Sequence, residues 1–192
     1  MLSSIVFRFY LLLKKEAKWG EFDLPDIYTR YARKLFENLI KKFINHLNSH
    51  NVAVKMIKLA IVGIGNCASS LIQGIYHYEN KNKDQCVGLL NYKIDNYKPS
   101  DIDIVAAFDI DERKVGKDVS EAIFAKPNNT KIFFENIPKI GTKVLRGTTF
   151  DDFPQHMNDY DENIRFKESP EKPVDVVKIL KETKPYFLLD LC

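Results

Sequence analysis

The sequence predicts an α/β fold, in which residues 56–192 form an incomplete, doubly wound parallel sheet behind an amphipathic helical segment. Two short, nearly continuous apolar runs, at 58–63 and 103–109, are typical of strands buried on both faces of a sheet. The stretch after each run has the composition of a helix, as expected when helices connect parallel strands. Near the amino terminus, apolar residues recur at intervals of three and four, which is the period of a helix.

Charge divides the chain into two segments at about residue 56. Residues 1–55 hold ten basic and five acidic side chains, whereas residues 56–192 hold 19 basic and 21 acidic ones. In the first segment Asp23 is placed to cap a helix, whose apolar stripe then runs to Leu47. Such a helix can pack on its own domain, or bind a membrane surface or a partner helix. The role of residues 1–55 therefore stays open.

Composition excludes several classes of protein. The chain has 192 residues, of which 45% are hydrophobic and 29% charged, so low-complexity and collagen-like classes are excluded. A net charge of +3 predicts no nucleic-acid partner, and no run is long enough to predict a membrane span. Three scattered cysteines indicate reduced thiols in a cytoplasmic protein, and four dispersed histidines predict no metal site.

The predicted elements follow a βαβ order in the second segment. Strands are predicted at 58–63, 103–109, part of 131–134 and 186–190, and helices at 67–79, 112–125 and 174–183. The first two strands should be parallel neighbours joined by a right-handed crossover. The polar stretch 79–100 then has to be an insertion between the first helix and the second strand.

A glycine motif links the first strand to the first helix. Residues 63–68 read Gly-Ile-Gly-Asn-Cys-Ala, which is the pattern G-x-G-x-x-A. In a strand–turn–helix context, Gly63 permits the tight turn, Gly65 lets a pyrophosphate approach the backbone, and Ala68 lets the helix lie close to the strand. The helix N-terminus then offers free N–H groups to the phosphates. The motif predicts a Rossmann-like domain that binds a dinucleotide.

An acidic residue at the end of the second strand indicates which of the two nicotinamide dinucleotides, NAD or NADP, the domain binds. Asp109 ends the run 103–109 and is placed to accept hydrogen bonds from the ribose hydroxyls of NAD, and its charge would repel a 2′-phosphate. It follows Ala68 by 41 residues, more than the usual ~20, which the insertion explains. A helix N-cap is the alternative role for Asp109. Arg113 lies four residues on and would soften the repulsion, so we expect a preference for NAD over NADP.

Three strings of residues carry a resemblance to a known family. AIVGIGNCASSLIQGI is followed by DIVAAFDIDERKVGKD and then by EAIF and PNNT, with RG and PVDVV further on. In this order they closely resemble the prokaryotic branch of the myo-inositol-1-phosphate synthase family, over residues 57–180. The run NCASS is far more specific than the glycine pattern alone.

The resemblance implies an NAD-dependent isomerase of inositol and phospholipid biosynthesis, homo-oligomeric when intact, which converts glucose 6-phosphate to inositol phosphate. In the family, NAD oxidises the C5 hydroxyl, the ring closes by aldol attack and NADH returns the hydride, so NAD acts catalytically. The resemblance implies these cofactor-binding residues: Gly63, Gly65, Asn66, Cys67, Ala68, Asp109, Asp118, Asn128, Asn129 and Thr183. For Asn128 and Asn129, a polar turn is an equally open alternative.

The sequence also departs from the family pattern. The half that supplies the family's catalytic lysines and its oligomer interface has no counterpart after residue 183, so no catalytic residue is predicted in this chain. Lys114 and its neighbours are predicted to lie on a surface helix. Residues 1–55 match nothing in the family, and the chain resembles a truncated product with an added leader. We expect it to make no inositol phosphate alone. The alternatives are a generic Rossmann dehydrogenase domain and a non-catalytic gene fragment.

Overall fold

The structure is a computed structural model that describes Lys41 and residues 56–86, 88–89, 91–149 and 159–192. The helix predicted in residues 1–55 lies outside the described residues, apart from Lys41. Within the described part of the chain, no helix combines the length and the apolar character needed to cross a membrane.

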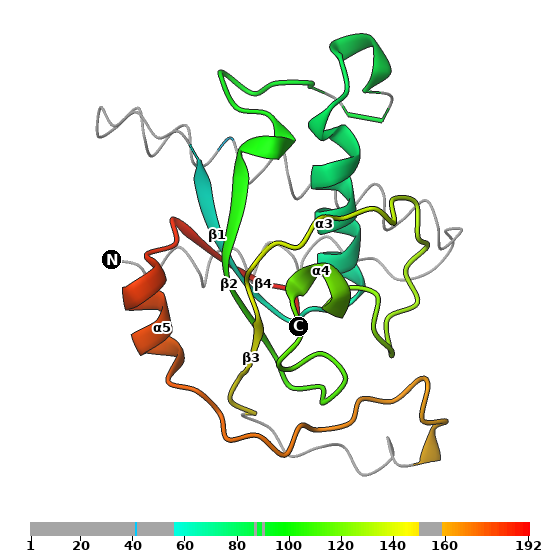
Figure 1. Cartoon of the computed structure of the whole chain (residues 1–192), viewed down its shortest axis with the longest axis vertical. Coiled ribbons are helices and arrows are strands. Elements are labelled where there is room, and N and C mark those ends of the chain that lie inside the picture. Colours follow the sequence, from blue (N-terminus) through cyan, green and yellow to red (C-terminus); the bar gives the residue numbers. More distant parts are fainter. Residues whose placement is uncertain (1–40, 42–55, 87, 90, 150–158) are drawn as a thin grey trace.

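Four parallel strands form the sheet, in the order β3-β2-β1-β4 (Figure 1). They are β1 (Ile57–Val62), β2 (Ile102–Asp109), β3 (Val144–Arg146) and β4 (Phe187–Asp190). The predicted parallel pairing of the first two strands is confirmed, with Ile57 opposite Ile102 and Val62 opposite Phe108. Because β1 is central, the chain moves outward to β2 and β3 and then returns to the other side of β1, which is the order of a doubly wound sheet.

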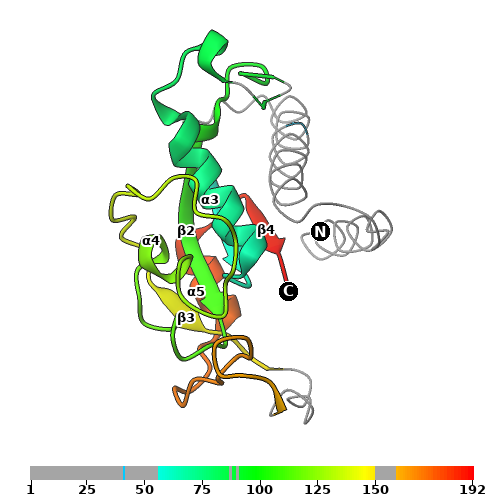
Figure 2. The same ribbon diagram turned by 90° about the vertical axis from the view of Figure 1, so that its right-hand side faces the viewer.

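Helices cover both faces of this sheet. Helix α3 (Asn66–Glu79) and the short α4 (Val119–Ala122) pack on one face, where Leu59 and Ile61 are fully buried. Helix α5 (Val176–Thr183) packs on the opposite face. Figure 2 turns this arrangement by 90°, so that α3 lies in front of β2 and α5 behind it. The two-sided cover explains why β1 and β2 read as continuous apolar runs rather than as alternating ones.

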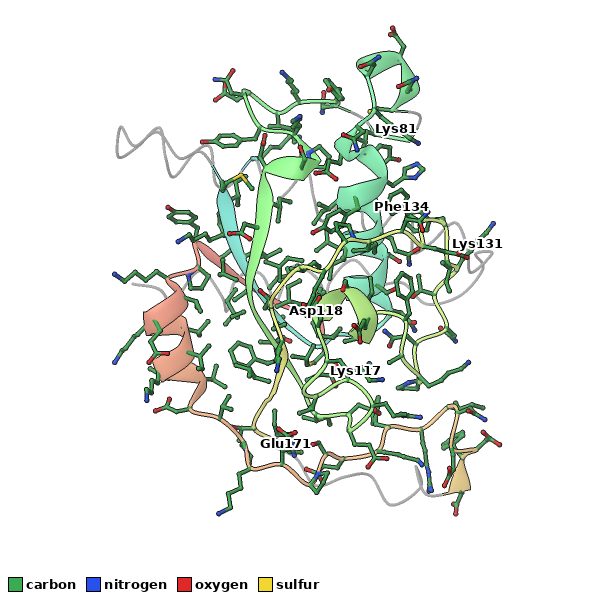
Figure 3. The ribbon with its side chains drawn as sticks, in the orientation of Figure 1. Lys81, Lys117, Asp118, Lys131, Phe134 and Glu171 are labelled. Atoms are coloured by element: carbon green, nitrogen blue, oxygen red, sulfur yellow. The ribbon has the colours of Figure 1, made fainter. Side chains whose placement is uncertain are left out.

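The predicted strand at 131–134 is wrong, and a glutamine explains why. Gln73 on α3 is completely buried, and its Oε1 accepts hydrogen bonds from the backbone N–H groups of Phe133 (2.9 Å) and Phe134 (3.2 Å). Those donors are held by a helix side chain and are not available to a sheet. Figure 3 shows Lys131 and Phe134 on the extended segment that runs beside α3. The third strand is instead β3, which has only three residues.

The helix predicted at 112–125 is also largely wrong, because only α4 forms within it. Gly116 adopts a left-handed φ of 84°. Its N–H donates to Val144 O at 2.8 Å, and Val144 N–H donates back to Lys117 O at 2.9 Å. The turn is therefore held by the neighbouring strand β3, and the helix can begin only after its cap at Asp118. The polar stretch 79–100 contains a short 3₁₀ turn, η1 (Lys83–Gln85), and runs into a second, η2 (Pro99–Asp101).

Candidate functional site

The turn after β1 requires a glycine at its first position. Gly63 has a φ of +83°, which side chains rarely adopt, and its N–H donates to Phe108 O at 2.9 Å. A Cβ added there would lie 2.9 Å from Cys192 Sγ and 3.2 Å from the backbone atoms Cys192 N and Leu191 C. Both the dihedral angle and the space therefore exclude a side chain at Gly63.

Gly65 has neither of these structural requirements. Its φ of −90° and ψ of −159° suit any residue, and a Cβ added there would meet nothing within 4 Å. Gly65 is also the N-cap of α3, where no side chain caps the helix and no acidic residue stands in the first turn. The first N–H groups of a helix have no intrahelical partner, and together with the helix dipole they attract anions. The backbone beside Gly65 thus offers an open cradle that fits a phosphate group.

The side chains of Cys67 and Ala68 serve packing. Ala68 is fully buried against the sheet, so its small size lets α3 approach β1 closely. Burial raises the pKa of the Cys67 thiol above its usual range. Desolvation disfavours the charged thiolate form of a buried cysteine. Cys67 is therefore a protonated thiol at neutral pH, which fits a packing role better than a nucleophilic one.

Asp109, the last residue of β2, lies directly beside the glycine turn. Its Oδ2 accepts a hydrogen bond from Ile64 N–H at 2.7 Å, and its Oδ1 accepts from the N–H groups of Ile110 (2.7 Å) and Asp111 (2.9 Å). Because β1 and β2 are parallel neighbours, their carboxyl ends meet at the same edge of the sheet. The long insertion between them does not disturb this meeting.

The segment that carries Asn128 and Asn129 is also brought to the turn. Asn66 Oδ1 accepts from Asn129 N–H at 2.8 Å and from Thr130 N–H at 3.1 Å. Asn128 Nδ2 donates to Ile64 O at 3.0 Å. The Asn128 side chain and the Asn129 backbone are thus bound to the glycine loop, and Asn128 N–H also closes a turn by donating to Ala125 O at 3.1 Å.

Asp118 stabilises the start of α4 through its side chain. Its side chain caps α4 and accepts hydrogen bonds from Ser120 N–H (3.0 Å), Ile140 N–H (3.1 Å) and Gly141 N–H (2.8 Å). Burial acts to raise the pKa of this carboxyl, but the hydrogen bonds from Ser120, Gly141 and Ile140 outweigh it, and the pKa is lowered. Figure 3 shows Asp118 where the chain enters α4. Its carboxylate oxygens hold α4 and the segment at Ile140 and Gly141 together, and the cofactor role predicted for it stays a prediction.

We expect Asp118→Asn to lower the free energy of unfolding by about 1–3 kcal/mol at pH 7, since an amide nitrogen cannot accept the backbone donors. A carboxyl with a lowered folded pKa stabilises the fold above its unfolded pKa of about 3.9, and that stability is lost as the pH falls through the folded pKa. The gap between wild type and variant should therefore shrink below about pH 4. Urea unfolding at pH 7, 4 and 3 measures it, with Glu121→Gln on the exposed side of α4 as control. A gap that stays constant with pH would contradict this assignment.

Thr183 is not brought to the glycine turn. It ends α5, where its Oγ1 donates to Ile179 O at 2.8 Å. The chain then enters β4, whose Phe187 pairs with Leu59 near the start of β1. Thr183 therefore lies near the amino ends of the strands, whereas the turn follows their carboxyl ends. The structure therefore does not bring Thr183 together with the other residues predicted to bind the cofactor.

Two basic residues, Arg113 and Lys114, lie in surroundings other than those predicted for them. Arg113 does not face the ribose-binding acid, because its Nη2 lies 2.6 Å from Asp111 Oδ2 and donates to Arg165 O at 2.6 Å. Lys114, predicted on a surface helix, is only 3% exposed. Its Nζ donates to Asn128 Oδ1 at 3.0 Å and lies 3.6 Å from Asp109 Oδ2. No local pattern marks Lys114, because its burial depends on partners from β2 and from the segment after α4.

Comparison with known proteins identifies relatives by sequence. No family model matches the chain. Inositol-3-phosphate synthase of Mycolicibacterium smegmatis is 46% identical over 129 residues, which are 67% of this chain and 34% of the relative. The enzyme of the same name from Corynebacterium glutamicum is 42% identical over 139 residues, 72% of this chain and 37% of the relative.

A solved structure shares the fold. The crystal structure of Ari2 has a TM-score of 0.55 and 30% identity, covering 71% of this chain and 38% of that chain. The chain thus spans about a third of the length of the relatives that it matches. Over some 130 residues, this protein is related by sequence to bacterial inositol-3-phosphate synthases.

Proposed function

We propose that residues 56–192 bind NAD, with the pyrophosphate at the N-terminus of α3 and the adenosine ribose at Asp109. The observation that carries this proposal is Gly65, whose missing side chain is required neither by its dihedral angles nor by its neighbours. Glycine is an acceptable N-cap residue, and close approach of a ligand to the backbone is a second physical reason for a glycine there. The proposed cofactor-binding residues are Gly63, Gly65, Asn66, Cys67, Ala68, Asp109, Asn128 and Asn129.

These residues would hold the cofactor in distinct ways. The N–H groups of Asn66 and Cys67 begin α3 and can donate to pyrophosphate oxygens. A carboxylate has about four acceptor sites, and three N–H groups occupy sites on Asp109, so it retains capacity for a ribose hydroxyl. Asn66 and Asn128 position the turn through their hydrogen bonds to the segment after α4 and to Ile64.

The wider function that we propose is a part in inositol-3-phosphate synthesis from a sugar phosphate, as the names of the relatives suggest. Bound NAD would supply hydride acceptance and return during isomerisation of the sugar. The chain spans about a third of those enzymes, and we assign it cofactor binding and no catalytic residue. Its three free cysteines are consistent with a reducing compartment such as the cytoplasm.

Calorimetric titration of the full chain with NAD and with NADP tests the cofactor. We expect NADP to bind at least about tenfold more weakly, because the Asp109 carboxylate repels a 2′-phosphate. Asp109→Ala should weaken NAD binding by about 10–100-fold, as expected for loss of a hydrogen bond to a charged group. Saturating NAD should also raise the melting temperature of the wild type.

Asp84→Ala is the control for this experiment, because Asp84 is an exposed acid on η1. It should leave both affinities unchanged. Equal affinity of the wild type for the two dinucleotides would contradict the role of Asp109. Absence of any NAD binding by the folded chain would overturn the proposed function.

A further inference from the structure

Four interactions form a closed ring around the peptide of Ile64, between the two glycines of the turn. Ile64 N–H donates to Asp109 Oδ2 (2.7 Å), and Ile64 O accepts from Asn128 Nδ2 (3.0 Å). Lys114 Nζ joins the two partners, since it donates to Asn128 Oδ1 (3.0 Å) and lies 3.6 Å from Asp109 Oδ2. Each of these four residues thus contacts two of the others.

Lys114 supplies the positive charge of this ring. Its side chain is 4% exposed and that of Asp109 is 9% exposed, so the pair is largely removed from water. A buried charge is costly unless it is paired, and loss of one partner leaves the other uncompensated. The other cation close in sequence, Arg113, is held by Asp111 and by the carbonyl groups of Glu162 and Arg165. Lys114 is therefore the described cation that contacts the Asp109 carboxylate.

We infer that Lys114 is a positioning and specificity-determining residue of the dinucleotide site, an inference that rests on the proposed NAD binding. It acts on the cofactor through two groups. Through Asn128 it helps to fix the Ile64 carbonyl, and with it the backbone that faces the pyrophosphate. Through Asp109 it sets the net charge at the ribose 2′ position, where it partly cancels the repulsion of a 2′-phosphate.

The positioning effect and the charge effect change the affinities for NAD and NADP in different ways. Loss of the positioning effect weakens NAD and NADP alike, because both carry the same pyrophosphate. Loss of the charge effect weakens NADP alone, because a phosphate then faces an uncompensated carboxylate. A residue that served only to stabilise the fold would change the two affinities in the same proportion. The ratio of the NADP and NAD dissociation constants therefore separates specificity from stability.

The test is titration of Lys114→Met with both dinucleotides, with Lys117→Met as matched control. Lys117 is an exposed lysine in the same turn (Figure 3). We expect Lys114→Met to raise the NAD dissociation constant about tenfold, or 1.4 kcal/mol, and the NADP-to-NAD ratio about tenfold again. Lys114→Arg keeps the charge and should retain a ratio close to that of the wild type. The control should change neither value more than about twofold.

A second measurement, urea unfolding without nucleotide, covers the case in which Lys114→Met is too unstable to titrate. It compares Lys114→Met, Asp109→Asn and the double variant, because Asp109→Asn alone also removes an acceptor of backbone N–H groups. The double variant leaves no uncompensated charge, so it should lose less unfolding free energy than the sum of the two single losses, and additive losses would overturn the inference. So would a folded Lys114→Met with an unchanged ratio. Failure of the wild type to bind NAD would overturn the proposed function, and the urea comparison would still report on the charge pair.

Discussion

Gly63→Ala is expected to lower the free energy of unfolding by about 2–6 kcal/mol, a large part of the 5–15 kcal/mol that stabilises a typical domain. A non-glycine residue held at positive φ costs about 1–3 kcal/mol. The added Cβ would lie 3.2 Å from Cys192 N and Leu191 C, which are backbone atoms. Relief of that contact has to move the chain after β4 away from β1, at a further cost of about 1–3 kcal/mol.

Urea unfolding of the two proteins measures this loss, and Gly74→Ala is the matched control. Gly74 lies inside α3, where an added Cβ meets nothing within 4 Å. Alanine is favoured over glycine in a helix interior, so this control should gain up to about 1 kcal/mol. A loss below about 1 kcal/mol for Gly63→Ala would mean that the turn and the chain after β4 are not in contact.

Local patterns were sufficient to predict the elements whose partners are close in sequence or whose composition is distinctive. The runs at β1 and β2 are apolar because both of their faces are covered, so their composition reveals burial. Helix α3 follows a glycine turn and carries a clear apolar face, and the structure places it at 66–79 against a predicted 67–79. The prediction of β4 was likewise correct to within one residue.

Elements that depend on distant partners could not be predicted in this way. Lys131–Phe134 has the composition of a strand, but its donors are taken by Gln73, some 60 residues earlier. The helix predicted at 112–125 is interrupted because Gly116 and Lys117 bond to Val144. The candidate site also combines a feature set by local sequence with one set by distant partners. The glycine turn is a local motif, whereas the burial of Lys114 follows from Asn128 and Asp109, which no spacing connects to it.

Gly65→Val is expected to abolish NAD binding while the fold is retained. The backbone of Gly65 already has dihedral angles that valine accepts, and the space beside it is open. The change replaces a good N-cap residue with a poor one, so the free energy of unfolding should fall by only about 1 kcal/mol. The new methyl groups, however, would occupy the cradle in front of the first N–H groups of α3, where the pyrophosphate has to make contact.

Titration of folded Gly65→Val with NAD should therefore show a dissociation constant raised at least about 100-fold, which is about 2.7 kcal/mol. The same protein should unfold in urea close to the wild-type midpoint, and its melting temperature should no longer rise with NAD. Gly74→Ala, in the same helix but away from its N-terminus, should bind NAD as the wild type does. This contrast is the reverse of that at Gly63, where the substitution is expected to destabilise the fold. NAD binding that survives in Gly65→Val would remove the observation on which the cofactor proposal rests, because the open space at Gly65 would then have no ligand.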